Sequence, residues 1–123
     1  KNYKEAPSGF PGFETCLPLL LNEVNSGNLS LEIIERITSK NPAEIFNLKN
    51  RGKLQEGYFA DIVIIDLDKK FIVNPENFQT KAKYSPFIDM KLKGDVFMTI
   101  VNGKIGYKDG SYFNTKGIEI DYC

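Results

Sequence analysis

Hydrophobic positions divide the chain into a helical first part and a strand-rich second part. In the first part apolar side chains recur at helical spacing, from Leu17 to Val24 and again at Leu31, Ile34 and Ile37. From about position 60 onward the apolar residues form β-branched runs or alternate with polar residues, as they do in strands. This order predicts helices first and β-hairpins afterwards, which is hard to close into a single independent domain.

Start and stop signals predict three helices in the first part of the chain. Ser26-Gly27-Asn28 supplies a residue that tolerates the left-handed conformation and ends the first helix, and Ser30 is placed to cap the second. Asn41-Pro42-Ala43-Glu44 predicts a third start, with Asn41 as the cap and Pro42 in the first turn. We expect the first helix to be buried over much of its circumference, because apolar residues occupy most of its positions.

Two short strands are predicted next. Residues 60–66 contain the run Ile62-Val63-Ile64-Ile65 between aspartates, which is typical of a strand covered on both faces. Phe71-Ile72-Val73 forms the second strand, which Asn74-Pro75 ends. A strand of this kind needs neighbours on both sides, and the sequence offers few strands to supply them. We therefore expect a segment outside this sequence to complete the sheet.

An alternating pattern from Asp95 onward predicts a hairpin. Val96, Met98 and Ile100 fall on one face of a strand and their neighbours fall on the other. Asn102-Gly103 indicates a type I′ turn, because both central positions of that turn need a positive φ. The return strand is expected at 104–108, and Asp109-Gly110 predicts a further turn toward residues 111–113.

Composition and charge narrow the classes of partner. The chain has 123 residues, of which 41% are hydrophobic and 26% charged, as in globular domains. Sixteen basic residues balance sixteen acidic ones, so no net field attracts nucleic acid or anionic lipid. The apolar runs are much shorter than the roughly 20 residues that cross a bilayer. We therefore expect a small-molecule or protein partner, no nucleic acid and no membrane. Cys16 and Cys123 lie far apart in the sequence, which is consistent with free thiols in the reducing cytoplasm.

The candidate binding element is Pro7-Ser8-Gly9-Phe10-Pro11-Gly12. A glycine lets the backbone approach a planar ligand closely, and flanking prolines fix the amides in place beforehand. A purely structural turn is the alternative interpretation of such a cluster. The chain contains no histidine, the usual ligand of catalytic zinc, so we assign no metal ligand and no catalytic residue within it.

Other polar groups have a structural interpretation that we prefer. Glu14 and Thr15 fit a helix start better than catalysis, and Cys16 is expected to be a buried apolar residue rather than a nucleophile. We interpret Asp61, Asp66 and Asp68 as residues that mark the ends of strands and not as the ligands of a calcium site. A solvated loop is preferred over a single-stranded nucleic-acid site for the group Lys81, Lys83, Tyr84, Phe87, Lys91 and Lys93.

The run Ala6-Pro7-Ser8-Gly9-Phe10-Pro11-Gly12-Phe13-Glu14-Thr15, followed by Leu17-Pro18-Leu19-Leu20-Leu21, resembles the segment after the last barrel strand of dihydroorotases. Residues 38–46 and 52–66 resemble stretches that are widespread in cyclic amidohydrolases and do not identify the substrate. Residues 85–87, 93–96, 99–104 and 107–110 are similar to the closing β region of the same family. The resemblance covers the chain from about residue 6 to about residue 110.

The resemblance implies an α/β fold in which this chain is the C-terminal end of a (β/α)8 metal-dependent hydrolase barrel plus part of a small β-sandwich, completed by a missing N-terminal segment. Residues 1–50 would form the last loop and helices of the barrel, residues 51–113 the sandwich part, and residues 114–123 a tail. In this family main-chain groups at the positions of Ser8 and Gly9 contact the substrate ring. Many relatives have proline or alanine where Ser8 stands, which matters little for a backbone contact.

The activity that the resemblance implies is a zinc-dependent one. It is the reversible cyclisation of N-carbamoyl-L-aspartate to L-dihydroorotate in de novo pyrimidine (UMP) biosynthesis. A pair of zinc ions, with ligands in the N-terminal portion of the same enzyme, would activate a hydroxide, so the chain should be active only with that portion.

Further partners in such an enzyme are a second copy of the chain, as a homo-oligomer, or aspartate transcarbamoylase. The open alternatives are a hydantoinase, dihydropyrimidinase or allantoinase fragment, and a non-catalytic scaffold resembling dihydroorotase.

Overall fold

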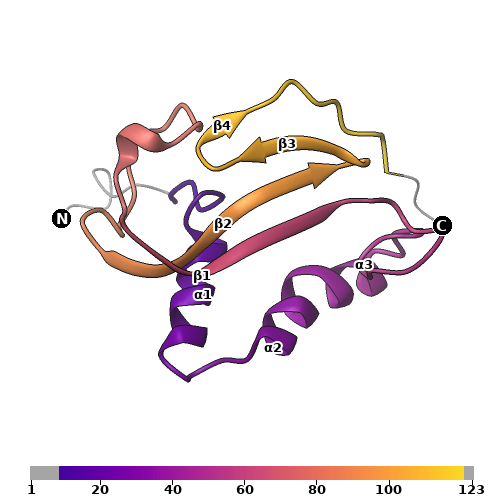
Figure 1. The fold of residues 1–123 in the computed structure, drawn as a ribbon, viewed down its shortest axis with the longest axis horizontal. Coiled ribbons are helices and arrows are strands. Elements are labelled where there is room, and N and C mark those ends of the chain that lie inside the picture. The colour runs from indigo at the N-terminus through magenta and orange to yellow at the C-terminus, as the bar shows by residue number, and fades with distance from the viewer. Residues whose placement is uncertain (1–8, 121–123) are drawn as a thin grey trace.

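Helices precede a single antiparallel sheet in the computed structural model, which describes residues 9–120. Figure 1 shows α1 crossing behind the sheet, and α2 and α3 alongside its β1 edge. The sheet has four strands in the order β1-β2-β3-β4. The elements are α1 (Cys16–Asn25), α2 (Leu31–Glu35), η2 (Arg36–Lys40), α3 (Asn41–Ile45), β1 (Ile62–Ile72), η3 (Pro75–Asn77), β2 (Lys91–Val101), β3 (Lys104–Lys108) and β4 (Ser111–Tyr112).

Two asparagines on one face of α1 fasten this helix to the sheet. Asn22 Oδ1 accepts a hydrogen bond from the backbone N–H of Lys93 at 3.1 Å. Asn25 Nδ2 donates to the backbone carbonyl oxygens of Leu67 and Lys93, each at 3.0 Å. Because Leu67 lies in β1 and Lys93 in β2, α1 is held by both strands at once.

A small apolar core lies where β1, β2 and their connection meet. Val73, Phe78 and Leu92 are buried there, and Leu19 of α1 packs against them. The same core contacts two further partly buried aromatic side chains, Phe71 and Phe87. This core therefore joins the first helix, the sheet and the long connection between β1 and β2.

The two predicted β-turns are confirmed. Asn102 and Gly103 have φ angles of 49° and 75°, and Val101 pairs with Lys104 across that turn. Asp109 and Gly110 have φ angles of 41° and 85°, and they lead directly into β4. The type I′ turn signal thus located both hairpins correctly.

The prediction of two separate strands at 60–66 and 71–73 is wrong, because a single strand, β1, runs through both. The pairing of β1 with β2 shifts its register between Asp66 and Lys70. Asp66 Oδ1 accepts from the backbone N–H groups of Asp68 and Lys69, at 2.9 and 3.2 Å, so this carboxylate stabilises the irregular stretch. A bulge of this kind carries a strand through polar residues that interrupt its apolar pattern.

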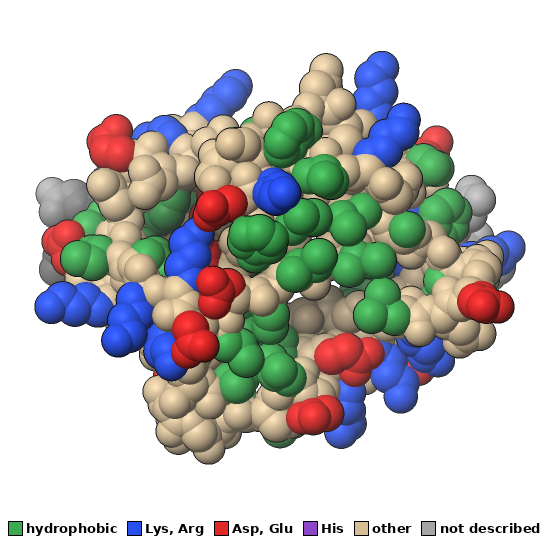
Figure 2. Space-filling view, in the orientation of Figure 1, with side chains coloured by type: hydrophobic (Ala, Val, Ile, Leu, Met, Phe, Trp, Pro, Cys, Tyr) green, Lys and Arg blue, Asp and Glu red, His purple; other side chains and the backbone are tan. Residues whose placement is uncertain are grey.

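β1 forms an edge of the sheet and is not covered on both faces within residues 9–120. Its side chains Val63 and Ile64 are 49% and 41% exposed. Figure 2 shows hydrophobic side chains gathered across the middle of this face of the molecule. The apolar run at residues 62–65 does form a strand, as predicted. The cover on both faces that this run implies is not supplied by residues 9–120.

The predicted third helix start is also wrong in its detail. Asn41 has helical backbone angles and does not act as a cap, since η2 leads into α3 without a break. The backbone N–H of Asn41 donates to the carbonyl of Arg36, five residues earlier. Pro42 cannot donate a backbone hydrogen bond, and the wider π turn accommodates it without ending the helix.

Burial along α1 extends over much of its circumference, as predicted, but it is mostly partial. Pro18 and Leu21 are buried, and the apolar residues Leu17, Leu19, Leu20 and Val24 are half-buried. Cys16 is exposed, which corrects the prediction of a buried thiol. The first turn of α1 projects the sulfur outward, because the buried side of the helix is centred on Leu21. None of the helices within residues 9–120 is long and apolar enough to span a membrane.

Candidate functional site

The glycine- and proline-rich loop leads directly into α1. The carbonyl oxygen of Gly12 accepts from the backbone N–H groups of Thr15 and Cys16, at 3.1 and 2.8 Å, and this turn starts the helix. Thr15 is 2% exposed and donates its hydroxyl to the same carbonyl at 3.4 Å. The loop thus has a fixed carboxy-terminal end, which the helix-start interpretation of Thr15 anticipated.

The other predicted partner in the helix start, Glu14, contacts a different part of the chain. Glu14 Oε1 accepts hydrogen bonds from the backbone N–H groups of Gln79 and Thr80, each at 2.9 Å. Its second oxygen, Oε2, is buried without a hydrogen-bond partner among the residues that the structure describes. No local pattern predicts this contact, because Glu14 and Gln79 are 65 positions apart.

Within the connection between β1 and β2, residues 78–87 form a platform beside the loop. Asn74 caps the short helix η3, Phe78 is 5% exposed, and Lys83 Nζ donates to the carbonyl of Phe78. Ser85 is 8% exposed, and its hydroxyl oxygen accepts from the backbone N–H of Phe87 at 3.2 Å. These contacts hold the residues that follow η3 in a defined conformation.

Two aromatic residues of this platform reach the candidate binding element. Tyr84 Oη donates to the carbonyl oxygen of Gly9 at 2.7 Å. The ring of Phe87 meets the ring of Phe10 edge to face, with centroids 5.6 Å apart and planes at 80°. Sequence patterns placed both aromatic residues in a solvated loop and contain no signal for either contact, and Phe87 instead packs against the apolar core.

Of the two predicted substrate-binding residues, only Gly9 lies within the described residues, and Ser8 lies outside them. Gly9 is exposed, and among the described residues a β-carbon at its position would meet no atom within 4 Å apart from its chain neighbours. As far as these residues extend, the backbone at Gly9 is open to a ligand on the side away from Tyr84. The contact of both residues with a substrate ring stays a prediction.

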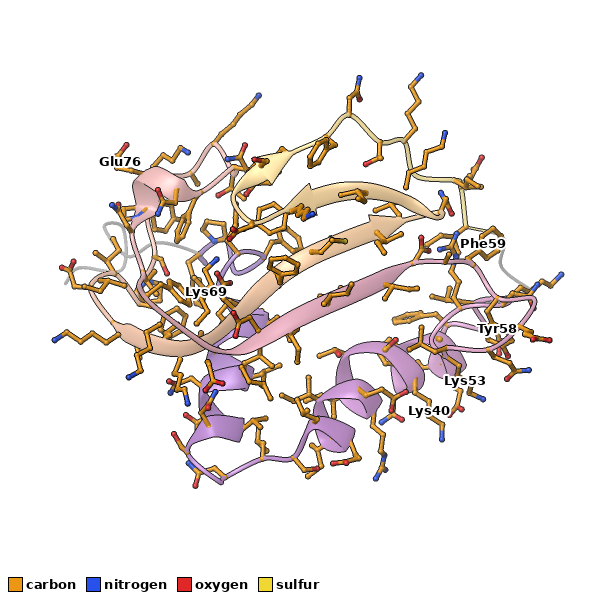
Figure 3. All side chains as sticks on the ribbon, in the orientation of Figure 1. Lys40, Lys53, Tyr58, Phe59, Lys69 and Glu76 are labelled. Atoms are coloured by element: carbon orange, nitrogen blue, oxygen red, sulfur yellow. The ribbon has the colours of Figure 1, made fainter. Side chains whose placement is uncertain are left out.

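An open groove of about 820 Å³ extends from Glu14 across the sheet. Its walls include Lys69 and the rings of Tyr107 and Tyr112, whose centroids are 5.0 Å apart. Lys69 Nζ forms ion pairs with Asp95 Oδ2 at 3.1 Å and with Asp109 Oδ1 at 3.4 Å. Figure 3 shows Lys69 on the strand β1, away from η3, where Glu76 is labelled.

These contacts shift the pKa values of two groups in the groove, Lys69 and Tyr112. Partial burial lowers the pKa of Lys69, but the hydrogen bond and the charge of Asp95 outweigh it, and the net pKa is raised. Burial raises the pKa of the Tyr112 hydroxyl, and the nearby Tyr107 and Glu14 act in the same direction. Both groups are therefore in their protonated forms near neutral pH.

The aspartates and lysines that sequence analysis singled out make structural contacts. Asp61 pairs with Arg51 and accepts from the backbone N–H of Asn102 at 2.8 Å. Asp68 pairs with Lys93 at 2.8 Å, and the hydrogen bond and charge of this lysine lower the pKa of the carboxyl. Asp61 directly precedes β1, as the strand-end interpretation predicts, but Asp66 and Asp68 lie inside β1, so strand-end punctuation is wrong for these two residues.

The side chains present do not fit a zinc centre. Within residues 9–120, no three histidine, cysteine, aspartate or glutamate side chains come together in a way that could hold a metal ion. Catalytic zinc sites in proteins need about three protein ligands of these kinds. We derive no chemical step through a metal from the residues of this chain.

Comparison with known proteins identifies relatives over most of this length. A family model described as "Amidohydrolase family" matches residues 13–106. A dihydroorotase of Methanosphaera stadtmanae is 43% identical over 113 residues, which are 92% of this chain and 26% of that protein. A dihydroorotase of Endomicrobium trichonymphae is 51% identical over 107 residues, which are 85% of this chain and 25% of that protein.

The arrangement of elements also matches a solved structure. L-hydantoinase (dihydropyrimidinase) from Arthrobacter aurescens superposes with a TM-score of 0.85 at 36% identity, over 94% of this chain and 25% of that one. The chain spans about a quarter of the length of the curated relatives it matches. The match confirms a mixed helix and sheet fold of the amidohydrolase type for these residues.

Proposed function

The chain belongs to the amidohydrolase family, and from this membership we propose that it forms the carboxy-terminal part of a dihydroorotase. The observation that carries the proposal is the similarity to dihydroorotases over most of the chain. The proposed reaction is the reversible cyclisation of N-carbamoyl-L-aspartate to L-dihydroorotate in pyrimidine biosynthesis. This chain would act together with a preceding segment that corresponds to the rest of its relatives.

The proposed division of labour follows the elements. Residues 1–50 would close a (β/α)8 barrel, residues 51–113 would contribute part of a β-sandwich, and residues 114–123 would form a tail. Within residues 9–120 one edge of β1 has no partner strand and its apolar side chains are exposed, which supports a covering segment, because natural proteins rarely leave such an edge open. A pair of zinc ions would be held by ligands of the preceding segment.

The role of this chain in the reaction is to bind and orient the ring. Main-chain groups of Ser8 and Gly9 would hydrogen-bond the planar cyclic amide. Backbone donors and acceptors that are fixed in advance bind a planar ligand without a large cost of ordering. The contact of Glu14 with Gln79 and Thr80 supports this role, because it anchors the end of the loop that carries Gly9.

Production of the chain together with the preceding segment, as one enzyme, tests the proposal. We expect turnover of L-dihydroorotate that exceeds turnover of hydantoin and dihydrouracil, and about two zinc ions per protomer. The isolated 13.9 kDa chain is the control, and we expect it to be inactive. Full turnover by the isolated chain would contradict the proposed division. A zinc-free, inactive assembly would instead support a non-catalytic scaffold.

A hydantoinase or dihydropyrimidinase activity is the second candidate. The observation that favours it is the close superposition on L-hydantoinase. Preference of the assembled enzyme for hydantoin over dihydroorotate would establish this alternative. Assembly as a homo-oligomer or with aspartate transcarbamoylase, and a cytoplasmic location, also stay predictions, which the native mass and cell fractionation of the enzyme address.

A further inference from the structure

Two segments far apart in the sequence meet at the candidate binding element. The first is the loop of residues 9–15, and the second is the platform of residues 78–87. They touch in three ways, through a tyrosine hydroxyl, a pair of aromatic rings and a carboxylate. The contacts span the whole loop, from Gly9 at its start to Glu14 at its end.

The platform is built on the sheet and not on the loop. The backbone N–H of Val73 donates to the carbonyl of Met90, and the backbone N–H of Asp89 donates to the carbonyl of Val73, both at 3.0 Å. Val73 is 2% exposed and belongs to the same core as Phe78. Tyr84 therefore extends from a segment whose two ends are fixed by the buried core.

Within residues 9–120, the hydrogen bond from Tyr84 is the contact that orients the backbone at Gly9. Gly9 carries no side chain, the described residues leave open the space that a β-carbon would fill, and glycine rotates more freely about its backbone bonds than any other residue. The 2.7 Å hydrogen bond from Tyr84 fixes the carbonyl of the peptide that joins Gly9 to Phe10. The edge-to-face contact of Phe10 with Phe87 restrains the other side of the same peptide.

We infer that Tyr84 is a positioning residue for substrate binding, which acts through the Gly9 peptide and does not touch the reacting atoms. This inference rests on the proposed function, because it assumes that the backbone at Gly9 binds the ring. Without the hydroxyl the peptide samples more orientations, and the substrate must order it on binding. The loss therefore affects ground-state and transition-state binding alike, which raises KM and leaves kcat unchanged.

The experiment compares Tyr84→Phe with wild type in the assembled enzyme, with L-dihydroorotate as the substrate. This substitution removes one oxygen and keeps the ring, so the packing of the platform is retained. We expect KM to rise about threefold to tenfold, as loss of one hydrogen bond predicts, with kcat within about twofold and an unchanged melting temperature. Tyr58→Phe is the matched control, because Tyr58 lies beside α3, far from the loop (Figure 3).

The outcomes separate this inference from the proposed function. An active wild type whose KM is unaffected by Tyr84→Phe overturns the positioning role alone. A fall in kcat at constant KM, or an equal rise of KM in Tyr58→Phe, also overturns it. A wild type that acts on hydantoin or dihydrouracil but not on L-dihydroorotate overturns the proposed substrate, and the same two variants then decide the role of Tyr84 on the substrate that is turned over. An assembly inert toward all three compounds overturns both.

Discussion

Gly94 of β2 lies so close to Leu21 of α1 that a β-carbon at position 94 would come within 2.7 Å of the β-carbon of Leu21. The β-carbon of Leu21 is fixed to the helix backbone, so no rotation of this buried side chain relieves the contact. Gly94 also has a φ of 103°, which other residues rarely adopt. The distance between the first helix and the sheet is therefore set by the absence of a side chain at one position.

We predict that Gly94→Ala lowers the free energy of unfolding by about 2–4 kcal/mol, because it adds a close contact in the core to a strained backbone. Chemical denaturation of the assembled enzyme measures the change. Gly117→Ala is the control, since a β-carbon there meets nothing within 4 Å among the residues that the structure describes. Equal stability of the two variants would show that α1 can move away from β2 at little cost.

A second prediction concerns Asn25, whose side-chain amide bridges α1 to both β1 and β2. Asn25→Ala leaves the carbonyl oxygens of Leu67 and Lys93 without this donor, and because both bonds are exposed to water we expect a loss in the free energy of unfolding of about 0.5–1.5 kcal/mol. Thermal unfolding of the assembled enzyme measures it. Asn28→Ala serves as the comparison, because Asn28 Nδ2 donates only to the exposed Glu23 carboxylate within the described residues. Similar melting temperatures for the two variants would argue against the bridge.

Features that adjacent residues encode could be predicted from the sequence, whereas contacts between residues far apart in the sequence could not. The turns at Asn102-Gly103 and Asp109-Gly110 and the cap at Ser30 are encoded by adjacent residues, and all three are present. The contacts that organise the candidate site join residues at large separations, such as Tyr84 with Gly9, 75 positions apart. Nothing in the local pattern of either segment encodes its partner, so such contacts become visible only in three dimensions.

The errors in the predicted elements have the same origin. The apolar pattern breaks at Asp66, and a local rule ends the strand there, yet pairing with β2 carries β1 past the break. Likewise Asn41 and Pro42 form a valid start signal, which the π turn of η2 overrides. The exposed position of Cys16 depends on which side of α1 meets the sheet, and the broad apolar stripe of that helix left the side undetermined.

The ion pairs of Lys69 predict a pH dependence on the alkaline side. Its pKa is raised, so its stabilising contribution is fully present below the ordinary lysine pKa and is lost as the pH rises through the raised value. We expect the melting temperature of Lys69→Met to fall less steeply above about pH 10 than that of wild type. Near neutral pH the substitution should lower the free energy of unfolding by less than about 1 kcal/mol, because the ion pairs are partly exposed. Melting temperatures between neutral and alkaline pH measure the effect.

Tyr112 needs a separate control in that experiment. Its pKa is also raised, so its ionisation destabilises the fold over the same alkaline range and with the same sign. Tyr112→Phe removes this contribution while Lys69 and its ion pairs remain. If the alkaline fall is unchanged in Lys69→Met and disappears in Tyr112→Phe, the tyrosine alone is responsible and the prediction for Lys69 is wrong.

The last prediction concerns Glu14, whose carboxylate joins the loop to the platform. Glu14→Ala leaves the backbone N–H groups of Gln79 and Thr80 without their acceptor, and we expect a loss of about 1–3 kcal/mol in the local stability of the platform. The two amides should then exchange their hydrogens faster, and trypsin should cut sooner after Lys81. Glu14→Gln keeps an acceptor oxygen and is the matched variant, so it should protect both amides almost as well as wild type. Equal exchange in Glu14→Ala and Glu14→Gln would mean that the platform is held by Phe78 and the sheet alone, and that the carboxylate does not stabilise it.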